Sequence, residues 1–195
     1  MAATTDSVEL VGDEAARNVA RAVMFAAATS ATAPMKVVHP LVPSVPITLQ
    51  TLWVFLAGVV LGPVWAGVSF VLYVVAGLAG LPVFAGGAGG FGVVFGGPTG
   101  GFVLGFPLAA VTIGAVAHGV GGLKRPGEIS LVRLVAALVA GSAVVYAAGA
   151  VGFAVVQGIG LAAAVLAVVV PFLPVAAVKL AATVAIVRSD AVVAR

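Results

Sequence analysis

Long apolar runs separated by short Pro- and Gly-rich breaks dominate the chain. A helix that crosses the hydrocarbon core of a bilayer needs about 20 residues, because each residue advances about 1.5 Å across a layer about 30 Å thick. Breaks at residues 40–46, at Gly62-Pro63 and at Pro82 end three of the runs, since proline interrupts a helix. The pattern predicts an all-α integral membrane protein with six transmembrane helices, over residues 16–38, 48–61, 64–81, 99–120, 131–156 and 173–187.

Residues 84–102 form a glycine-dense break in this pattern. Glycine is unfavourable in helix interiors, so this segment and the Pro-rich stretch 40–46 are predicted to be irregular outer loops. The run GGAGGFGVVFGGPTGG lacks the GK[ST] sequence that completes a phosphate-binding P-loop. Irregular backbone at membrane depth has to pack inside protein or line a watery cavity. The glycine-dense segment is therefore expected to help form a cavity rather than to bind phosphate.

Composition agrees with lipid as the main solvent of the chain. Of 195 residues, 63% are apolar and 8% are charged, whereas soluble domains have about half and a quarter. The chain has no cysteine, and its two histidines, His39 and His118, lack metal-ligand spacing, so no metal site or cofactor is expected. No motif of a hydrolase appears, and the few scattered charges do not suggest nucleic acid. We expect a protein of the lipid bilayer that is not an enzyme.

Basic residues are distributed unequally between the two faces that six helices would define. If both chain ends share one face, the opposite face keeps only Lys36. Basic loops are retained in the cytoplasm, so the pattern predicts a multi-pass protein of the cell membrane with both termini cytoplasmic. The predicted parts are an N-terminal tail (1–14), a transmembrane domain (15–188) and a C-terminal tail (189–195). The cytoplasmic face would collect seven basic residues: Arg17, Arg21, Lys124, Arg125, Arg133, Arg188 and Arg195.

Once the other basic residues are assigned to the two faces, Lys179 is left as the one basic residue inside a predicted span. An ammonium group within the membrane costs several kcal/mol unless it meets an anion, a carbonyl group or water. All six acidic residues fall in segments assigned to the cytoplasmic face, whereas Lys179 is near the outer end of its helix. Two interpretations stay open: a ligand that enters from outside supplies the partner, or the side chain extends to the outer headgroups.

Alanines recur at four-residue spacing in the first predicted span, as Ala22 with Ala26 and as Ala27 with Ala31. Small residues spaced in this way form a flat strip that allows another helix to approach closely.

Four stretches of the sequence closely resemble the BioY family, the biotin-specific S components of energy-coupling factor transporters. They are VPITLQT at residues 45–51, LPVFAGGAGGFGVVFGGPTGG at 81–101, GFPLAA at 105–110 and PFLP at 171–174. The resemblance implies a six-helix substrate-binding domain that binds biotin with high affinity near the outer face. It also implies docking of the alanine strip onto a transmembrane coupling subunit, whose ATPase partners supply the energy, because the S component has no ATP site.

The resemblance also suggests site residues. The family's last motif usually reads PFxPGDxxK, in which the acid and the lysine take part in biotin binding. Lys179 matches this lysine, whereas Val175 and Ala176 replace the Gly-Asp pair. The aromatic residue after PTGG, often Tyr in the family, is Phe102, and Gly86 stands where some members have Asn. The candidate substrate-binding residues are Lys179, Gln50, Phe84, Phe91, Thr99 and Phe102.

Two alternatives to biotin uptake stay open at this point. Without an acid at Ala176, the same fold could bind a different small anionic vitamin or a biotin precursor such as dethiobiotin. In a different class, the chain would be a structural or assembly protein of the membrane whose Gly-rich loops only pack helices.

Overall fold

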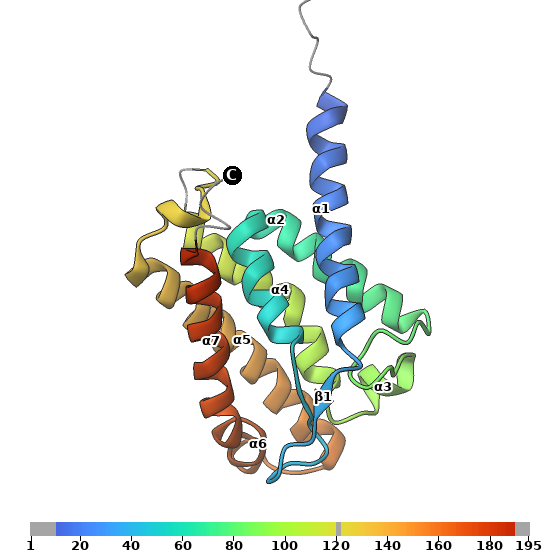
Figure 1. The fold of residues 1–195 in the computed structure, drawn as a ribbon. Helices are drawn as coiled ribbons and strands as arrows, with labels where there is room; N and C mark the ends of the chain where they lie inside the picture. Colours follow the sequence, from blue (N-terminus) through green and yellow to red (C-terminus); the bar gives the residue numbers. More distant parts are fainter. Residues whose placement is uncertain (1–10, 120–121, 190–195) are drawn as a thin grey trace, which may run out of the picture.

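The computed structural model describes residues 11–119 and 122–189, which form a bundle of helices (Figure 1). Two-residue strands, β1 (Lys36–Val37) and β2 (Ile47–Thr48), pair antiparallel, and we call residues 36–48 the hairpin. Two 3-10 turns, η2 (Pro126–Glu128) and η3 (Val170–Phe172), connect helices. The helices are α1 (Val11–Thr32), α2 (Gln50–Leu78), α3 (Phe91–Phe95), α4 (Gly100–His118), α5 (Leu131–Gln157), α6 (Leu161–Val168) and α7 (Leu173–Arg188).

Among the residues that the structure describes, four helical stretches are long and apolar enough to cross a membrane. They are α2, α4, α5 and the run Leu161–Arg188, which contains α6 and α7. The structure is therefore mostly helical, and its described residues contain four candidate membrane-spanning stretches, in line with the hydrophobic pattern. The count of six stays a prediction, because α1 carries charged residues in its first half and the predicted second and third spans fall on one element, α2.

A sharp kink divides α2 at the predicted break. Gly62 has φ 74° and ψ −180°, which interrupts the helix, and Pro63 has no N–H to donate to the carbonyl of Val59. His118 of α4 replaces this donor: its Nε2 lies 3.0 Å from the Val59 oxygen. The N–H of Lys124 donates to Nδ1 of the same ring at 3.0 Å, so the proton is on Nε2. A histidine from α4 thus stabilises the kink in α2.

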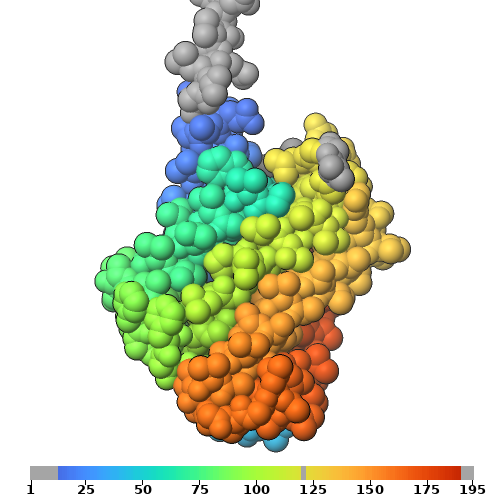
Figure 2. Space-filling model, turned by 180° about the vertical axis from the view of Figure 1, so that it is seen from behind, coloured from blue at the N-terminus to red at the C-terminus, as the bar shows by residue number. Residues whose placement is uncertain are grey.

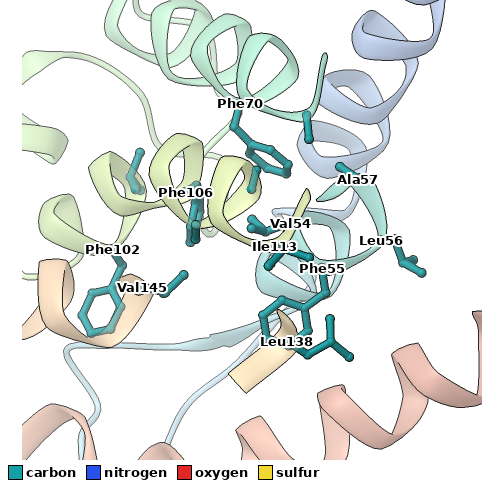
Figure 3. Close-up of a cluster of buried hydrophobic side chains, with 14 of the residues drawn as sticks. Val54, Phe55, Leu56, Ala57, Phe70, Phe102, Phe106, Ile113, Leu138 and Val145 are labelled. Carbon is teal, nitrogen blue, oxygen red and sulfur yellow. The ribbon is translucent and has the colours of Figure 1, made fainter. Parts of the chain in front are cut away.

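Helices α2, α4 and α5 form the centre of the bundle, where they run as neighbouring diagonal bands across the rear face (Figure 2). Small residues bring their backbones close together, as is common in membrane helices. A Cβ atom on Gly114 of α4 would overlap the backbone of Gly62 and Pro63. Phe55, Ile113 and Leu138, one from each helix, lie close together in the core (Figure 3).

The start of α1 and the end of α7 lie at one end of the bundle, which we call the terminal end (Figure 1). The hairpin, α3 and α6 lie at the opposite end, which we call the loop end. At the terminal end, the guanidinium of Arg188 donates to the carbonyl groups of Gly127 and Ile129 at 3.2 and 2.5 Å. These bonds hold the end of α7 beside η2. The cytoplasmic orientation of the terminal end stays a prediction.

Three boundaries differ from the sequence prediction. The first helix ends at Thr32, and the chain enters β1 where the prediction continued the helix to residue 38. The glycine-dense segment is not irregular throughout: Phe91–Phe95 forms one short helix, because this stretch contains four large side chains and only one glycine. Helix α1 begins at Val11, inside the predicted N-terminal tail, and residues 1–10 and 190–195 of the two predicted tails lie outside the described residues.

Replacing Gly114 with alanine is expected to destabilise the fold by about 1–3 kcal/mol, the usual cost of overpacking. The new methyl group would meet the rigid backbone at the Gly62-Pro63 kink, so α2 and α4 would have to separate. Thermal unfolding of the purified protein in detergent measures the loss. Gly160→Ala is the matched control, because no atom lies within 4 Å of the added Cβ. Equal unfolding temperatures for Gly114→Ala and the unmodified protein would contradict this account of the contact.

Candidate ligand-binding site

A cavity lies at the loop end, between the hairpin, the glycine-dense segment and helices α2, α4, α5 and α7. Its apolar wall includes Phe102, Phe106, Val145 and Phe172, and Figure 3 shows the first three close together. Its polar lining residues are Thr48, Gln50, Thr51, Thr99, Tyr146 and Lys179. Four predicted site residues, Gln50, Thr99, Phe102 and Lys179, thus come together from three different helices and one loop.

Gln50 begins α2 and is almost fully buried, with 4% of its surface exposed. Its Oε1 accepts from the Thr48 hydroxyl at 2.8 Å, and its Nε2 donates to the Tyr73 hydroxyl. Tyr73 in turn donates to the carbonyl of Val83 at 2.9 Å, which connects α2 to the residue just before the glycine-dense segment. These bonds fix the orientation of the amide. A primary amide has two N–H groups, so Gln50, which lines the cavity, keeps one N–H group beyond its bond to Tyr73.

Lys179 is the only charged side chain among the described residues that line this cavity. Its ammonium group donates to the Thr51 hydroxyl of α2 at 2.5 Å. The carboxylates within the described ranges belong to Asp13, Glu14 and Glu128, all at the terminal end. The side chain therefore reaches inward to α2 instead of outward to the headgroups, and two of its three N–H groups remain for a ligand.

The aromatic wall is joined to the hairpin through His39. Phe172 stacks on the imidazole ring with centroids 4.5 Å apart, and Nε2 of His39 lies 3.2 Å from the Pro171 carbonyl oxygen. The N–H of Leu41 donates to Nδ1 at 3.2 Å, so Nε2 carries the proton and donates to Pro171. On the other side of the cavity, Phe102 meets Tyr146 edge to face at 6.3 Å. The hairpin is thus held against the cavity by His39.

The cavity volume is about 60 Å³, whereas small-molecule sites commonly measure about 300 Å³ or more. The hairpin contributes Val45, Pro46 and Thr48 to the wall. A ligand of vitamin size therefore requires the hairpin or a neighbouring wall to move outward.

Two predicted wall residues lie outside this cavity. Phe84 is 1% exposed and packs against Tyr73, with ring centroids 5.5 Å apart, so it supports the Gln50 network from behind. Phe91 is 66% exposed and stacks on Phe95 at the surface of α3. Ala176 lines a separate apolar groove between α5, α6 and α7.

The alanine strip of α1 is divided between two environments. Ala22 is completely buried against α2, where the Ser69 hydroxyl donates to its carbonyl at 2.8 Å, and Ala26 is half-buried. Ala27 and Ala31 are exposed on the other side of the helix. Only the second pair is therefore accessible to a partner in this conformation.

Several lining residues were not among the sequence candidates. Thr48 and Thr51 flank Gln50 in the VPITLQT motif, Phe106 is within GFPLAA, and Phe172 is within PFLP, so the resemblance contained a signal for each. Tyr146 lies in the long, mostly apolar helix α5, outside these motifs, and had no such signal.

The family model described as BioY family matches residues 3–194, almost the entire chain. The chain belongs to the BioY family. Its BioY relatives include the biotin transporter BioY of Rhodobacter capsulatus, which is 40% identical over 184 residues, 90% of this chain and 93% of that protein. The biotin transporter BioY of Thermotoga maritima is 42% identical over 105 residues, 54% of this chain and 57% of that protein.

A solved structure agrees with the BioY assignment. The crystal structure of the S component for biotin from an ECF-type ABC transporter superposes with a TM-score of 0.76 at 26% identity. The match covers 92% of this chain and 93% of that one. The family prediction from the four sequence stretches is confirmed.

Tyr73→Phe is expected to lower the free energy of unfolding by about 1–3 kcal/mol. The change removes the hydroxyl that both accepts from Gln50 and donates to Val83, so two polar groups lose their partner. Thermal unfolding in detergent reports the change. Tyr146→Phe is the matched control, because its hydroxyl makes only a long 3.4 Å bond to Phe172. A larger loss in the control than in Tyr73→Phe would refute the importance of the Gln50 network.

Proposed function

We propose that this protein is the high-affinity biotin-binding membrane subunit of an ATP-driven vitamin importer, energised by separate coupling and ATPase subunits. The observation that carries the proposal is the Lys179 ammonium group, which lines a cavity at the loop end with no carboxylate beside it among the described residues. The curated relatives named as biotin transporters, and the solved biotin S component, support biotin as the cargo.

The lining chemistry suits biotin. The ureido group of biotin has one carbonyl acceptor and two N–H donors. Lys179 and Gln50 supply N–H donors for the carbonyl oxygen, and the hydroxyl oxygens of Thr48 and Thr99 supply acceptors for the ureido N–H groups. The apolar ring of biotin fits the wall formed by Phe102 and Phe172. Lys179, Gln50 and Thr48 each have a partner in the protein but keep spare hydrogen-bonding capacity, which a ligand in the cavity would use.

Lys179→Gln is expected to raise the dissociation constant for biotin about 10-fold or more. A hydrogen bond from a charged donor contributes about 1.5–3 kcal/mol, and glutamine retains the polarity but not the charge. Isothermal titration calorimetry on the purified protein measures both dissociation constants. Lys124→Gln is the matched control, since it removes one lysine charge at the terminal end, far from the cavity.

The same titration separates the importer from a purely structural protein. If the protein is purely structural, Lys179→Gln changes no biotin binding, because there is none. It then raises the stability of the fold, because a costly charge is removed from the membrane. A failure of the unmodified protein to bind biotin at micromolar concentrations would reject the proposal.

A second candidate keeps the fold but changes the cargo. Ala176, at the position of the family's acid, faces the apolar groove and supplies no carboxylate to the cavity. Without that acceptor, a biotin precursor such as dethiobiotin or another small anionic vitamin becomes a candidate ligand. Competition of each compound against labelled biotin distinguishes the two cargoes.

We propose that the accessible alanines of α1 form the docking strip for the coupling subunit. Ala27 and Ala31 are exposed, one turn apart, and small side chains allow close helix packing. The terminal end, with Arg17, Arg21 and Arg125, is the proposed cytoplasmic end, where the ATPases would lie.

The double substitution Ala27→Leu and Ala31→Leu is expected to abolish co-purification with the coupling and ATPase subunits while biotin binding is retained. The larger side chains would keep the partner helix away from the α1 backbone. Affinity purification of the co-expressed complex tests this. Ala162→Leu, an exposed alanine on α6, is the control and should leave the complex intact. Normal complex yield from the double variant would place the docking surface elsewhere.

A further inference from the structure

A second hollow lies directly outside the ligand cavity at the loop end. Its volume is about 380 Å³, and it shares Pro46, Ala85 and Thr99 with the wall of the inner cavity, so the two hollows adjoin. Its other walls come from the hairpin and from the glycine-dense segment. We call this outer hollow the vestibule. A ligand that approaches the inner cavity from this side passes through it.

Lys36 is the charged side chain of the vestibule. Its backbone belongs to β1 and pairs with Thr48 of β2, the same residue whose hydroxyl donates to Gln50. Its side chain crosses Gly86, and Nζ lies 2.5 Å from the position that a Cβ atom on this glycine would occupy. The N–H of Gly86 also donates to the Ala33 carbonyl at 3.0 Å. Glycine at position 86 therefore leaves the space in which the ammonium group of Lys36 lies.

The charges around Lys36 favour an anion. The carboxylates of the described residues, on Asp13, Glu14 and Glu128, lie at the terminal end. A concave surface that carries one sign of charge raises the local concentration of ions of the opposite sign and speeds their association. Lys36 is solvent-exposed, so it can pair with an anion that keeps part of its hydration shell.

Desolvation determines which end of a biotin-like ligand belongs in which hollow. Burying a carboxylate costs much more than burying a neutral ureido group whose hydrogen bonds are satisfied. Each hollow contains one ammonium group, but Lys179 lies in the narrow inner cavity beside Phe102 and Phe172, where a carboxylate would lose its hydration, whereas the exposed Lys36 lies in the wide vestibule. The neutral polar head therefore favours the inner cavity, and the carboxylate favours the vestibule.

We propose that the vestibule is a carboxylate subsite in which Lys36 binds the acid group of the ligand, while the neutral head of the ligand contacts Gln50 and Lys179 in the inner cavity. This inference rests on the proposed function and deepens it, because it assigns the orientation of the ligand. It also makes Lys36 a residue that selects free acids over their esters and amides.

The test compares biotin with biotin methyl ester, which has the same head and no carboxylate, as ligands of the full-length purified protein. Lys36→Gln should raise the dissociation constant for biotin by up to about 5-fold, the upper end for an exposed ion pair, and leave the dissociation constant for the ester unchanged. Lys36→Arg should retain the preference for the acid. In 1 M salt the difference between the unmodified protein and Lys36→Gln should shrink, because the charges are then screened.

Lys124→Gln is the control for loss of one positive charge and should change neither constant. Equal weakening of acid and ester by Lys36→Gln would overturn the subsite while leaving biotin binding intact. A preference for the acid that is lost in Lys179→Gln but not in Lys36→Gln would also overturn it, since the carboxylate would then lie in the inner cavity. If the unmodified protein binds neither compound, the proposed function itself fails, and the subsite with it.

Discussion

The structure depends on one constraint: lipid offers no hydrogen bonds, so each polar group at membrane depth needs a partner within the chain. Where a helix is interrupted, a side chain from another helix supplies the missing bond. His118 donates to the Val59 carbonyl at the kink in α2. The guanidinium of Arg133 donates to the Val116 carbonyl near the end of α4 at 2.9 Å. In the described part of the chain, the buried polar side-chain atoms all have a partner.

The same constraint explains the location of the cavity. At the loop end the chain leaves helical geometry in the hairpin and in the glycine-dense segment, and the bonds among Thr48, Gln50 and Tyr73 join these irregular stretches to α2. Polar side chains thus gather where regular backbone is missing. Lys179 adds a positive charge to this set, and the single bond to Thr51 satisfies only part of its capacity. A site for a small polar ligand follows from the way the fold satisfies its own backbone.

Sequence reasoning succeeded where a residue contrasts with its surroundings. A lysine in an apolar helix, a Gly-Pro break and a glycine-dense segment stand out, and they located Lys179, the kink in α2 and the loop end. It was less successful inside uniformly apolar helices. In a membrane, the lipid-facing and inward-facing sides of a helix are both apolar, so hydrophobic periodicity cannot tell that Tyr146 lines the cavity or that Ala22 is covered by α2 while Ala27 is exposed. Phe84 and Phe91 show the same difficulty, since both are phenylalanines in one loop and only the fold separates a buried ring from a surface ring.

The kink in α2 has a consequence for how the chain is made. The Val59 carbonyl, which has no helical N–H partner at the kink, accepts instead from His118, 59 residues further along the chain. The backbone N–H of Lys124 holds the ring of His118 in turn. During synthesis, the first part of α2 emerges from the ribosome well before α4 exists. Until α4 is inserted, the Val59 carbonyl has to be hydrated or held by the insertion machinery, and the two halves of α2 are free to change their angle. The final shape of this helix is therefore a late event of biogenesis, reached only when α4 is in place beside it.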